Sequence, residues 1–183
     1  MKKTKLIREE RAVGRLAEII ALEYGIPQAK SRQIGIAASI HDFGKLKIPK
    51  SILEKPGRLT KEEFEVMKTH TILGAEMMNS ITGEMGKMTR TIARHHHDFW
   101  DGGGYWGYRA SELPIYVSIT SLADVTIALL NRRVYKEPWS LKDVMAYIFD
   151  RSGTQFSPKL VEAFLPLMKK DKRVVNIFEQ VAA

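Results

Sequence analysis

Apolar residues recur along most of this chain with the spacing of an α-helix. In "LIREERAVGRLAEIIALEYG", which begins at residue 6, they form one helical stripe that Gly25 and Pro27 end. The same spacing predicts further helices over 28–41, 60–78, 84–97, 113–130, 140–150, 157–169 and 171–182. No segment keeps the period of two that marks a strand, so an all-α fold is expected.

Local signals mark the starts of two of these helices. Thr60 is followed three residues later by Glu63, which predicts a capping box at the start of the helix over 60–78. Ser157 is expected to cap the helix over 157–169, with Pro158 at its first position. These signals place helix boundaries independently of the apolar spacing.

Two stretches between the helices read as ordered loops. Residues 45–59 contain two prolines and a glycine, and residues 98–112 contain three consecutive glycines. The chain shows no repeat, no low-complexity segment and no flexible linker. It is therefore predicted to form one domain, a helical bundle over 1–183 that ends in a helix over 171–183.

Composition narrows the class of protein. The chain has no cysteine, which excludes disulfides and thiolate metal sites. No apolar run approaches the roughly 20 residues of a membrane helix, and no apolar core of a signal peptide follows the basic start. A soluble cytoplasmic protein is expected. The formal net charge of +8 favours an anionic partner, but the basic residues are scattered, so nucleic acid is not the expected one.

Candidate chemistry is concentrated in the histidines. All five lie within 57 positions, at 41, 70, 95, 96 and 97. His70 lies next to the apolar stripe of the helix over 60–78 (Phe64, Met67, Thr71 and Met78), which is expected to face inward. A buried neutral histidine is the ordinary alternative for any one of them. Five together, next to carboxylates, favour a metal site instead.

Two aspartates add to the histidines. Asp42 follows His41 where an apolar helix ends, and Asp124 is the one charged residue of "SITSLADVTIALL". A carboxylate on so apolar a helix is costly unless an Arg, a helix cap or a cation pairs with it. Imidazole and carboxylate together suit Fe, Mn or Zn. Two such ions about 3.5–4 Å apart can clamp an in-line displacement at phosphorus.

The order of these motifs resembles a known family. The stretches are "HDFGK", "IPKSILEKPGRLTKEEFEVMKTHTILGAEMM", "IARHHHDFWDGGGYW", "LADVTIALLNRRVYK" and "TQFSPKLVEAFL". This series resembles the HD-GYP domain, the branch of the HD phosphohydrolase superfamily that hydrolyses cyclic di-GMP, over about residues 6–168. The resemblance implies an all-α fold with a dinuclear or trinuclear metal site in its core.

The resemblance also implies roles for single residues. The metal ligands it implies are His41, Asp42, His70, His96, His97 and Asp124. Counting back from the "WDG" pattern at residue 100 matches the family's two histidines and acid to His96, His97 and Asp98, so His95 is the extra histidine. Asp42 and Lys45 carry the catalytic role, with Lys45 near the phosphate.

Substrate contacts are implied at three further positions. Tyr105 is available to stack on or hydrogen-bond to the substrate, and Arg133 and Lys136 match the family's phosphate contacts. Arg133 lies nine residues after Asp124, about two and a half helical turns, so a continuous helix would direct the two side chains to opposite faces. The chain is therefore expected to bend near Asn131.

The sequence departs from the family pattern at three places. The signature ends Gly-Tyr-Trp, with Trp106 in place of proline. Ile127 stands where a second acid is often found. The usual histidine near the start of the first helix is missing, and Glu9 or Glu10 is expected to substitute for it as a metal ligand.

The resemblance implies a metal-dependent phosphodiesterase. It is expected to hold two divalent ions, Fe or Mn, and to open cyclic di-GMP to linear pGpG and then to GMP. One alternative is a hydrolase for another cyclic dinucleotide or nucleotide. The other is a signalling module without turnover that binds a nucleotide or, through the glycine loop, a partner protein.

Overall fold

The computed structural model describes residues 3–131 and 138–182, and these residues contain helices but no strand. The first half of the chain forms α1 (Lys3–Glu23), α2 (Gln28–Ala38), the short 3₁₀ helix η1 (Phe43–Lys47), α3 (Lys50–Leu53), α4 (Lys61–Lys68), α5 (His70–Met77) and α6 (Gly83–His95). The second half forms η2 (Ala110–Glu112), α7 (Ile115–Leu130), α8 (Leu141–Asp150), α9 (Pro158–Lys170) and α10 (Lys172–Ala182). The predicted all-α fold is confirmed.

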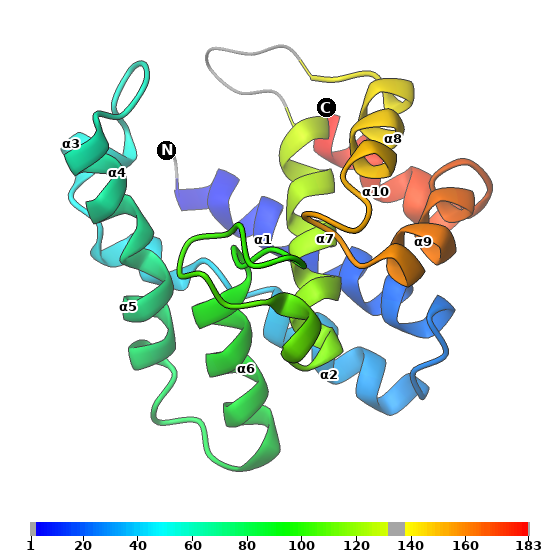
Figure 1. The fold of residues 1–183 in the computed structure, drawn as a ribbon, viewed down its shortest axis with the longest axis horizontal. Helices are drawn as coiled ribbons and strands as arrows, with labels where there is room; N and C mark the ends of the chain where they lie inside the picture. Colours follow the sequence, from blue (N-terminus) through cyan, green and yellow to red (C-terminus); the bar gives the residue numbers. More distant parts are fainter. Residues whose placement is uncertain (1–2, 132–137, 183) are drawn as a thin grey trace.

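The helices pack around α1 and α7, which contact one another inside the bundle. On one side of this pair, α5 packs against η1 and α6, and α2 packs against α1 and α6. On the other side, α8, α9 and α10 close the bundle (Figure 1). The ends of α2, α5 and α6 and the middle of α7 therefore meet at one place, and this is where the predicted ligands lie.

A continuous apolar core holds these helices together. Its largest fully buried side chains include Leu16 and Ile20 of α1, Ile34 of α2, Ile92 of α6 and Phe164 of α9. Apolar burial is the main stabilising term of a folded domain. Because the core joins helices from both ends of the sequence, it fixes the relative positions of the helices that carry the site.

The predicted helix over 60–78 is divided at Thr69 into α4 and α5. The hydroxyl of Thr69 donates to the carbonyl oxygen of Val66 at 2.6 Å, and such local bonds compete with the helical ladder. The predicted capping box of Thr60 and Glu63 is present. Phe64 was expected to face inward but is 42% exposed, so this prediction was wrong.

Other boundaries shift by a few residues. The helix predicted over 28–41 ends at Ala38, which leaves His41 in the turn that follows. Pro158 begins α9 as predicted, but the side chain of Ser157 makes no capping hydrogen bond. The helix α7 ends at Leu130 and Asn131 has an extended backbone, which confirms that the helix does not continue past Asn131. Arg133 and Lys136 lie outside the described residues.

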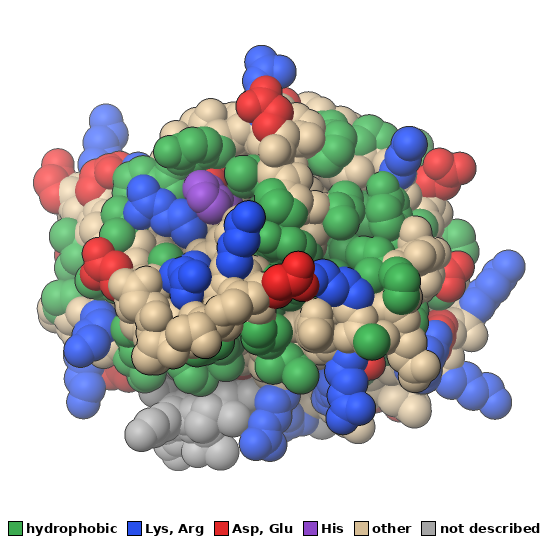
Figure 2. Space-filling view, turned by 90° about the horizontal axis from the view of Figure 1, so that it is seen from below, with side chains coloured by type: hydrophobic (Ala, Val, Ile, Leu, Met, Phe, Trp, Pro, Cys, Tyr) green, Lys and Arg blue, Asp and Glu red, His purple; other side chains and the backbone are tan. Residues whose placement is uncertain are grey.

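Among the described helices, none is both long enough and apolar enough to cross a membrane. Figure 2 shows one face of the molecule, on which Lys and Arg side chains are spread among apolar surface and are not gathered in one cluster. This agrees with the scattered basic residues of the sequence.

Candidate metal centre

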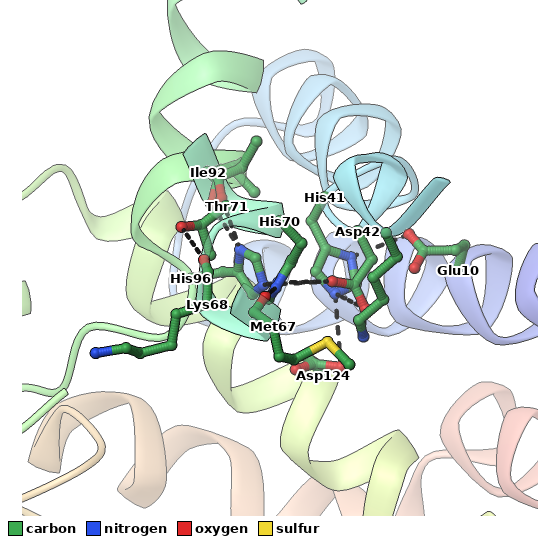
Figure 3. A network of polar contacts seen from close by, with 12 residues as sticks. Glu10, His41, Asp42, Met67, Lys68, His70, Thr71, Ile92, His96 and Asp124 are labelled. Atoms are coloured by element: carbon green, nitrogen blue, oxygen red, sulfur yellow. Dashed lines mark hydrogen bonds and ion pairs between the residues drawn. The ribbon is translucent and has the colours of Figure 1, made fainter. Parts of the chain in front are cut away.

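Four segments bring the predicted ligands together. His41 and Asp42 lie in the turn between α2 and η1, His70 begins α5, His96 follows α6, and Asp124 lies in the middle of α7. Figure 3 shows their side chains directed toward one another, with Glu10 reaching in from α1. Potential ligand atoms that lie within 4.8 Å of one another form two groups in the described residues, and both groups contain Asp42.

A close backbone contact positions the η1 segment on α5. A Cβ atom added to Gly44 would lie 1.8 Å from the carbonyl oxygen of His70 and 2.6 Å from the amide nitrogen of Gly74. Only glycine fits at such an approach. Gly44 therefore allows Asp42, two residues earlier, to reach the imidazole of His70.

The first group contains Asp42, His70, His96 and His97. The Oδ1 atom of Asp42 lies 3.1 Å from Nε2 of His70 and 3.6 Å from Nε2 of His96. The two Nε2 atoms lie 3.3 Å apart. Four potential ligand atoms from three segments thus converge on one small volume.

The outer ring nitrogens of these histidines are held by backbone carbonyls. Nδ1 of His70 lies 2.7 Å from the carbonyl oxygen of Met67, and Nδ1 of His96 lies 3.0 Å from that of Ala93. Nδ1 of His41 lies 2.8 Å from the carbonyl oxygen of Ala38. A carbonyl only accepts, so each Nδ1 carries a proton, and the opposite ring nitrogen, Nε2, points into the cluster. Metal-binding histidines usually have such a partner on the outer nitrogen.

This arrangement fits a cation. The Nε2 atoms of His70 and His96 face each other and face the carboxylate of Asp42. Nε2 of His41 and Oδ1 of Asp42 are buried and have no hydrogen-bond partner among the described residues. Buried polar atoms of this kind are costly unless something satisfies them. A divalent ion accepts several such lone pairs at once.

The second group contains Glu10, His41 and Asp42. Nε2 of His41 lies 3.5 Å from Oδ1 of Asp124, and Nδ1 lies 3.1 Å from Oε2 of Glu10. Burial lowers the pKa of His41, but the charges of Glu10 and Asp42 outweigh it and raise that pKa well above its ordinary value. The same surplus of negative charge would attract a divalent ion in place of the proton.

Lys45 is the cation of this cluster among the described residues. Its Nζ atom contacts Oδ2 of Asp42. Burial raises the pKa of Asp42, but the charges of Lys45 and His41 dominate and hold that pKa well below its usual range. Asp42 is therefore ionised, with one oxygen facing Lys45 and the other facing His70.

An aromatic wall borders the cluster on the side of His97. The ring of Tyr105 lies 4.4 Å from that of His97, and Phe64 meets Tyr105 edge to face at 5.6 Å. Burial, and next the charge of His96, hold the pKa of His97 well below its ordinary value, so His97 is neutral. Burial also raises the pKa of Tyr105 to about 12, so its hydroxyl keeps its proton and can donate a hydrogen bond.

The extra histidine has a different environment. Nδ1 of His95 lies 2.8 Å from Oδ2 of the buried Asp98, and its ring packs against Tyr108. Oδ1 of Asp98 accepts a hydrogen bond from the backbone of Trp106 at 3.0 Å. Asp98 therefore joins His95 to the glycine loop, and neither residue belongs to the two ligand groups.

Trp106 joins the glycine loop to three helices, α4, α5 and α6. Its indole nitrogen donates to the hydroxyl of Thr71 in α5 at 3.0 Å. Its ring lies near two cations, 5.3 Å from Nζ of Lys68 and 5.2 Å from Cζ of Arg94. These are cation–π distances.

Backbone hydrogen bonds hold the rest of this loop. The amide of Tyr105 donates to the carbonyl of His97 at 3.2 Å. The amides of Trp100 and Asp101 donate to the carbonyls of Gln155 and Thr154, at 3.2 and 3.0 Å. Gly102 has a φ of 95°, the positive value that its position in the turn requires.

The structure brings most of the predicted site residues together: His41, Asp42, Lys45, His70, His96, His97, Tyr105, Asp124 and Glu10. It does not bring Glu9 there, because Oε1 of Glu9 accepts from the side chain of Asn131. Ile127, at the position of the missing second acid, is buried in the apolar core. No pattern in the sequence predicted the position of Phe64 beside Tyr105 or the partner of Trp106.

Comparisons with known proteins agree with this geometry. The sequence model of the HD domain family matches residues 1–160. A protein of Thermotoga maritima named "Cyclic di-GMP phosphodiesterase" is 42% identical over 174 residues, which cover 94% of this chain and 46% of that protein. A "3'3'-cGAMP-specific phosphodiesterase 2" of Vibrio cholerae is 38% identical over 149 residues, covering 81% of this chain and 28% of that protein. The chain thus spans less than half the length of these two relatives.

Solved structures support the fold. An "HDG"Y"P protein", Bd1817 of Bdellovibrio bacteriovorus, aligns with a TM-score of 0.68 at 18% identity, over 92% of this chain and 54% of that one. The HD domain of PgpH from L. monocytogenes, solved with cyclic-di-AMP, aligns with a TM-score of 0.57 at 19% identity, over 100% and 91%. With the family match and the His41–Asp42 pair in the cluster, these findings show that the chain belongs to the HD domain family and resembles its HD-GYP branch.

Proposed function

We propose that this chain is a metal-dependent phosphodiesterase that opens cyclic di-GMP. One observation carries the proposal: two groups of imidazole and carboxylate ligands share the buried carboxylate of Asp42. A carboxylate with two oxygens can bridge two ions, and paired ions are used in enzymes that cleave phosphodiesters. The relatives named as cyclic dinucleotide phosphodiesterases support the same reaction class.

Residues of both groups would hold the ions, Fe or Mn. Asp42, His70, His96 and His97 would hold one, and His41, Asp42, Asp124 and Glu10 would hold the other. When bound, such ions stabilise charge on phosphoryl oxygens and lower the pKa of water. Because the second group depends on Glu10 where the family has a histidine, we expect its ion to be lost more readily to a chelator.

Other residues would bind and orient the substrate. The ammonium of Lys45 lies at the edge of the cluster, where it can stabilise a phosphoryl oxygen that gains charge in the transition state. Tyr105 and Phe64 offer aromatic surface to a guanine base. Arg133 and Lys136, outside the described residues, would contact the second phosphate. The linear product pGpG would then be cut to GMP.

Turnover with assigned metals tests the proposal. The protein purified with its metals retained, or supplied with Fe(II) or Mn(II), should convert cyclic di-GMP to pGpG, and Asp42→Asn should abolish conversion. Cyclic GMP–AMP and cyclic di-AMP should be assayed beside it, since relatives act on or bind these ligands. Binding of cyclic di-GMP without product under all metals would instead identify a signalling module without turnover.

A further inference from the structure

A second cavity lies apart from the metal centre, in the groove between α1 and α2. Its volume is about 630 Å³, within the roughly 300–1,000 Å³ that is usual for small-molecule sites. Four arginines line it: Arg8, Arg11, Arg15 and Arg32. No lysine lines the groove among the residues whose side chains the structure describes. The basic residues described in the lining of the groove are therefore all arginines.

The two helices can form this groove because they touch backbone to backbone. A Cβ atom on Gly14 would lie 2.6 Å from the carbonyl oxygen of Gly35, and one on Gly35 would lie 2.8 Å from that of Gly14. Both glycines line the groove, so its floor is bare backbone and its walls are long side chains. Arg8, Arg11 and Arg15 follow one another at three- and four-residue spacing, which places them on one face of α1.

Most of these guanidinium groups have no partner in the part of the chain that the structure describes. Arg15 donates to Gln180 at 2.8 Å, but Arg8, Arg11 and Arg32 make no hydrogen bond or ion pair with any described residue. Among the described residues of the lining, Glu18 is the one acidic residue, and it pairs with none of the four arginines. Four positive charges and one negative charge thus line one small groove, and an anion would relieve the repulsion among the arginines.

We infer that the α1–α2 groove binds a phosphorylated small molecule of nucleotide size, at a site separate from the metal centre. Guanidinium forks match phosphate oxygens in pairs and stack on flat rings. The row from Arg8 to Arg15 is about 10 Å long, enough for a ligand with more than one phosphate. Ile36, 52% exposed at the groove, offers apolar surface to a base.

Residues of the groove lie close in sequence to residues of the metal centre, but the side chains of the groove point away from the metal centre. Arg11 follows Glu10 directly, and adjacent side chains on a helix diverge by about 100°. Glu10 is buried against His41, whereas Arg11 is exposed. Ser39, another residue of the lining, precedes His41 by two positions. The two sites therefore share α1 and the end of α2 without sharing a side chain.

Counting binding sites for guanosine 5′-diphosphate on the full chain with its metals tests this inference. Calorimetry should find two sites, one at the metal centre and one in the groove. Arg11→Gln with Arg32→Gln should weaken the groove site by at least about tenfold, because two charge-assisted hydrogen bonds are lost. Turnover of cyclic di-GMP should not change. His70→Ala should remove the metal-centre site and leave the groove site.

The matched control is Lys169→Gln with Lys170→Gln, which removes the same charge from exposed positions on α9. It should keep both sites. Inorganic pyrophosphate should compete for the groove. The absence of any site in His70→Ala, equal loss in the control pair, or binding of a poly-glutamate peptide in the groove without competition from pyrophosphate would each overturn the inference. Because binding is counted independently of product, failure of the proposed enzymatic function would leave this result unaffected.

Discussion

The Oε2 atom of Glu10 lies 3.1 Å from Nδ1 of His41, so a buried carboxylate of the first helix reaches the histidine of the His-Asp pair. Burial is the main cause that raises the pKa of Glu10, and the neighbouring His41 opposes it. Glu9, one residue earlier, contacts Asn131 instead. Of the two adjacent glutamates, Glu10 alone thus belongs to a group of potential ligand atoms among the described residues.

Substitution of the two glutamates separates their roles. We expect Glu10→Gln to lower the metal content under a mild chelator, because the ion near His41 loses a charged neighbour. Glu9→Gln, the matched control, should retain the wild-type content. Metal counted per chain during a chelator titration measures both. Equal retention by the two variants would show that Glu10 takes no part in metal binding.

The three consecutive histidines should differ in their effects. His96→Ala removes an Nε2 atom from the ligand group, so we expect loss of metal and of activity. His95→Ala should keep the metal but destabilise the fold by about 1–3 kcal/mol, because the buried Asp98 loses a hydrogen-bond partner. Metal analysis and urea unfolding distinguish the two. Loss of metal in His95→Ala but not in His96→Ala would show that His95, and not His96, is the ligand.

Substitutions at Gly44 and at the neighbouring Gly74 test the close backbone contact between η1 and α5. Gly44→Ala places a Cβ atom 1.8 Å from the carbonyl of His70, so we expect a loss of about 1–3 kcal/mol in the free energy of unfolding and weaker metal binding. Gly74→Ala meets its nearest atom at 3.3 Å and gains helix propensity, so its effect should stay within about 1 kcal/mol. If Gly44→Ala unfolds and loses metal no more readily than Gly74→Ala, the contact is not what positions Asp42.

The bond between Trp106 and Thr71 can be measured by a double-mutant cycle. Trp106→Phe and Thr71→Val each remove one partner, and their coupling energy should be about 0.5–1.5 kcal/mol in urea unfolding. Trp100→Phe combined with Thr71→Val is the control pair and should be additive, since no contact joins these two side chains in the described structure. Additivity in both pairs would mean that the hydrogen bond does not hold the loop.

The exposed ring of Phe64 should affect substrate binding. If it supports a base beside Tyr105, Phe64→Ala should raise KM for cyclic di-GMP by an amount equivalent to about 1–3 kcal/mol, with unchanged metal content. Phe149→Ala, at a 66% exposed ring on α8, is the matched control and should leave KM unchanged. A raised KM in both variants, or in neither, would exclude Phe64 from the substrate site.

The sequence predicted the helices and the set of potential metal ligands more completely than the contacts that surround these ligands. Helical apolar spacing is a local signal, and the run of His and Asp motifs is specific enough to select His41, His70 and Asp124. Which of Glu9 and Glu10 points toward the site depends on the orientation of α1 about its own axis relative to α2. The close backbone contact between Gly14 and Gly35 fixes this orientation. The hydrogen bond between Trp106 and Thr71 joins residues 35 positions apart, so no local sequence pattern predicts it.

The attachments of the glycine loop decide how substrate exchanges at the metal centre. Raising the loop would break the bonds of Trp106 to Thr71 and Asp98 and the backbone bonds to Thr154 and Gln155 together. A segment with so many bonds opens rarely, and its amide hydrogens should exchange with solvent on the slow scale of the helices beside it. We therefore expect the loop to act as a fixed wall and not as a lid, so that the turnover rate is not limited by its opening.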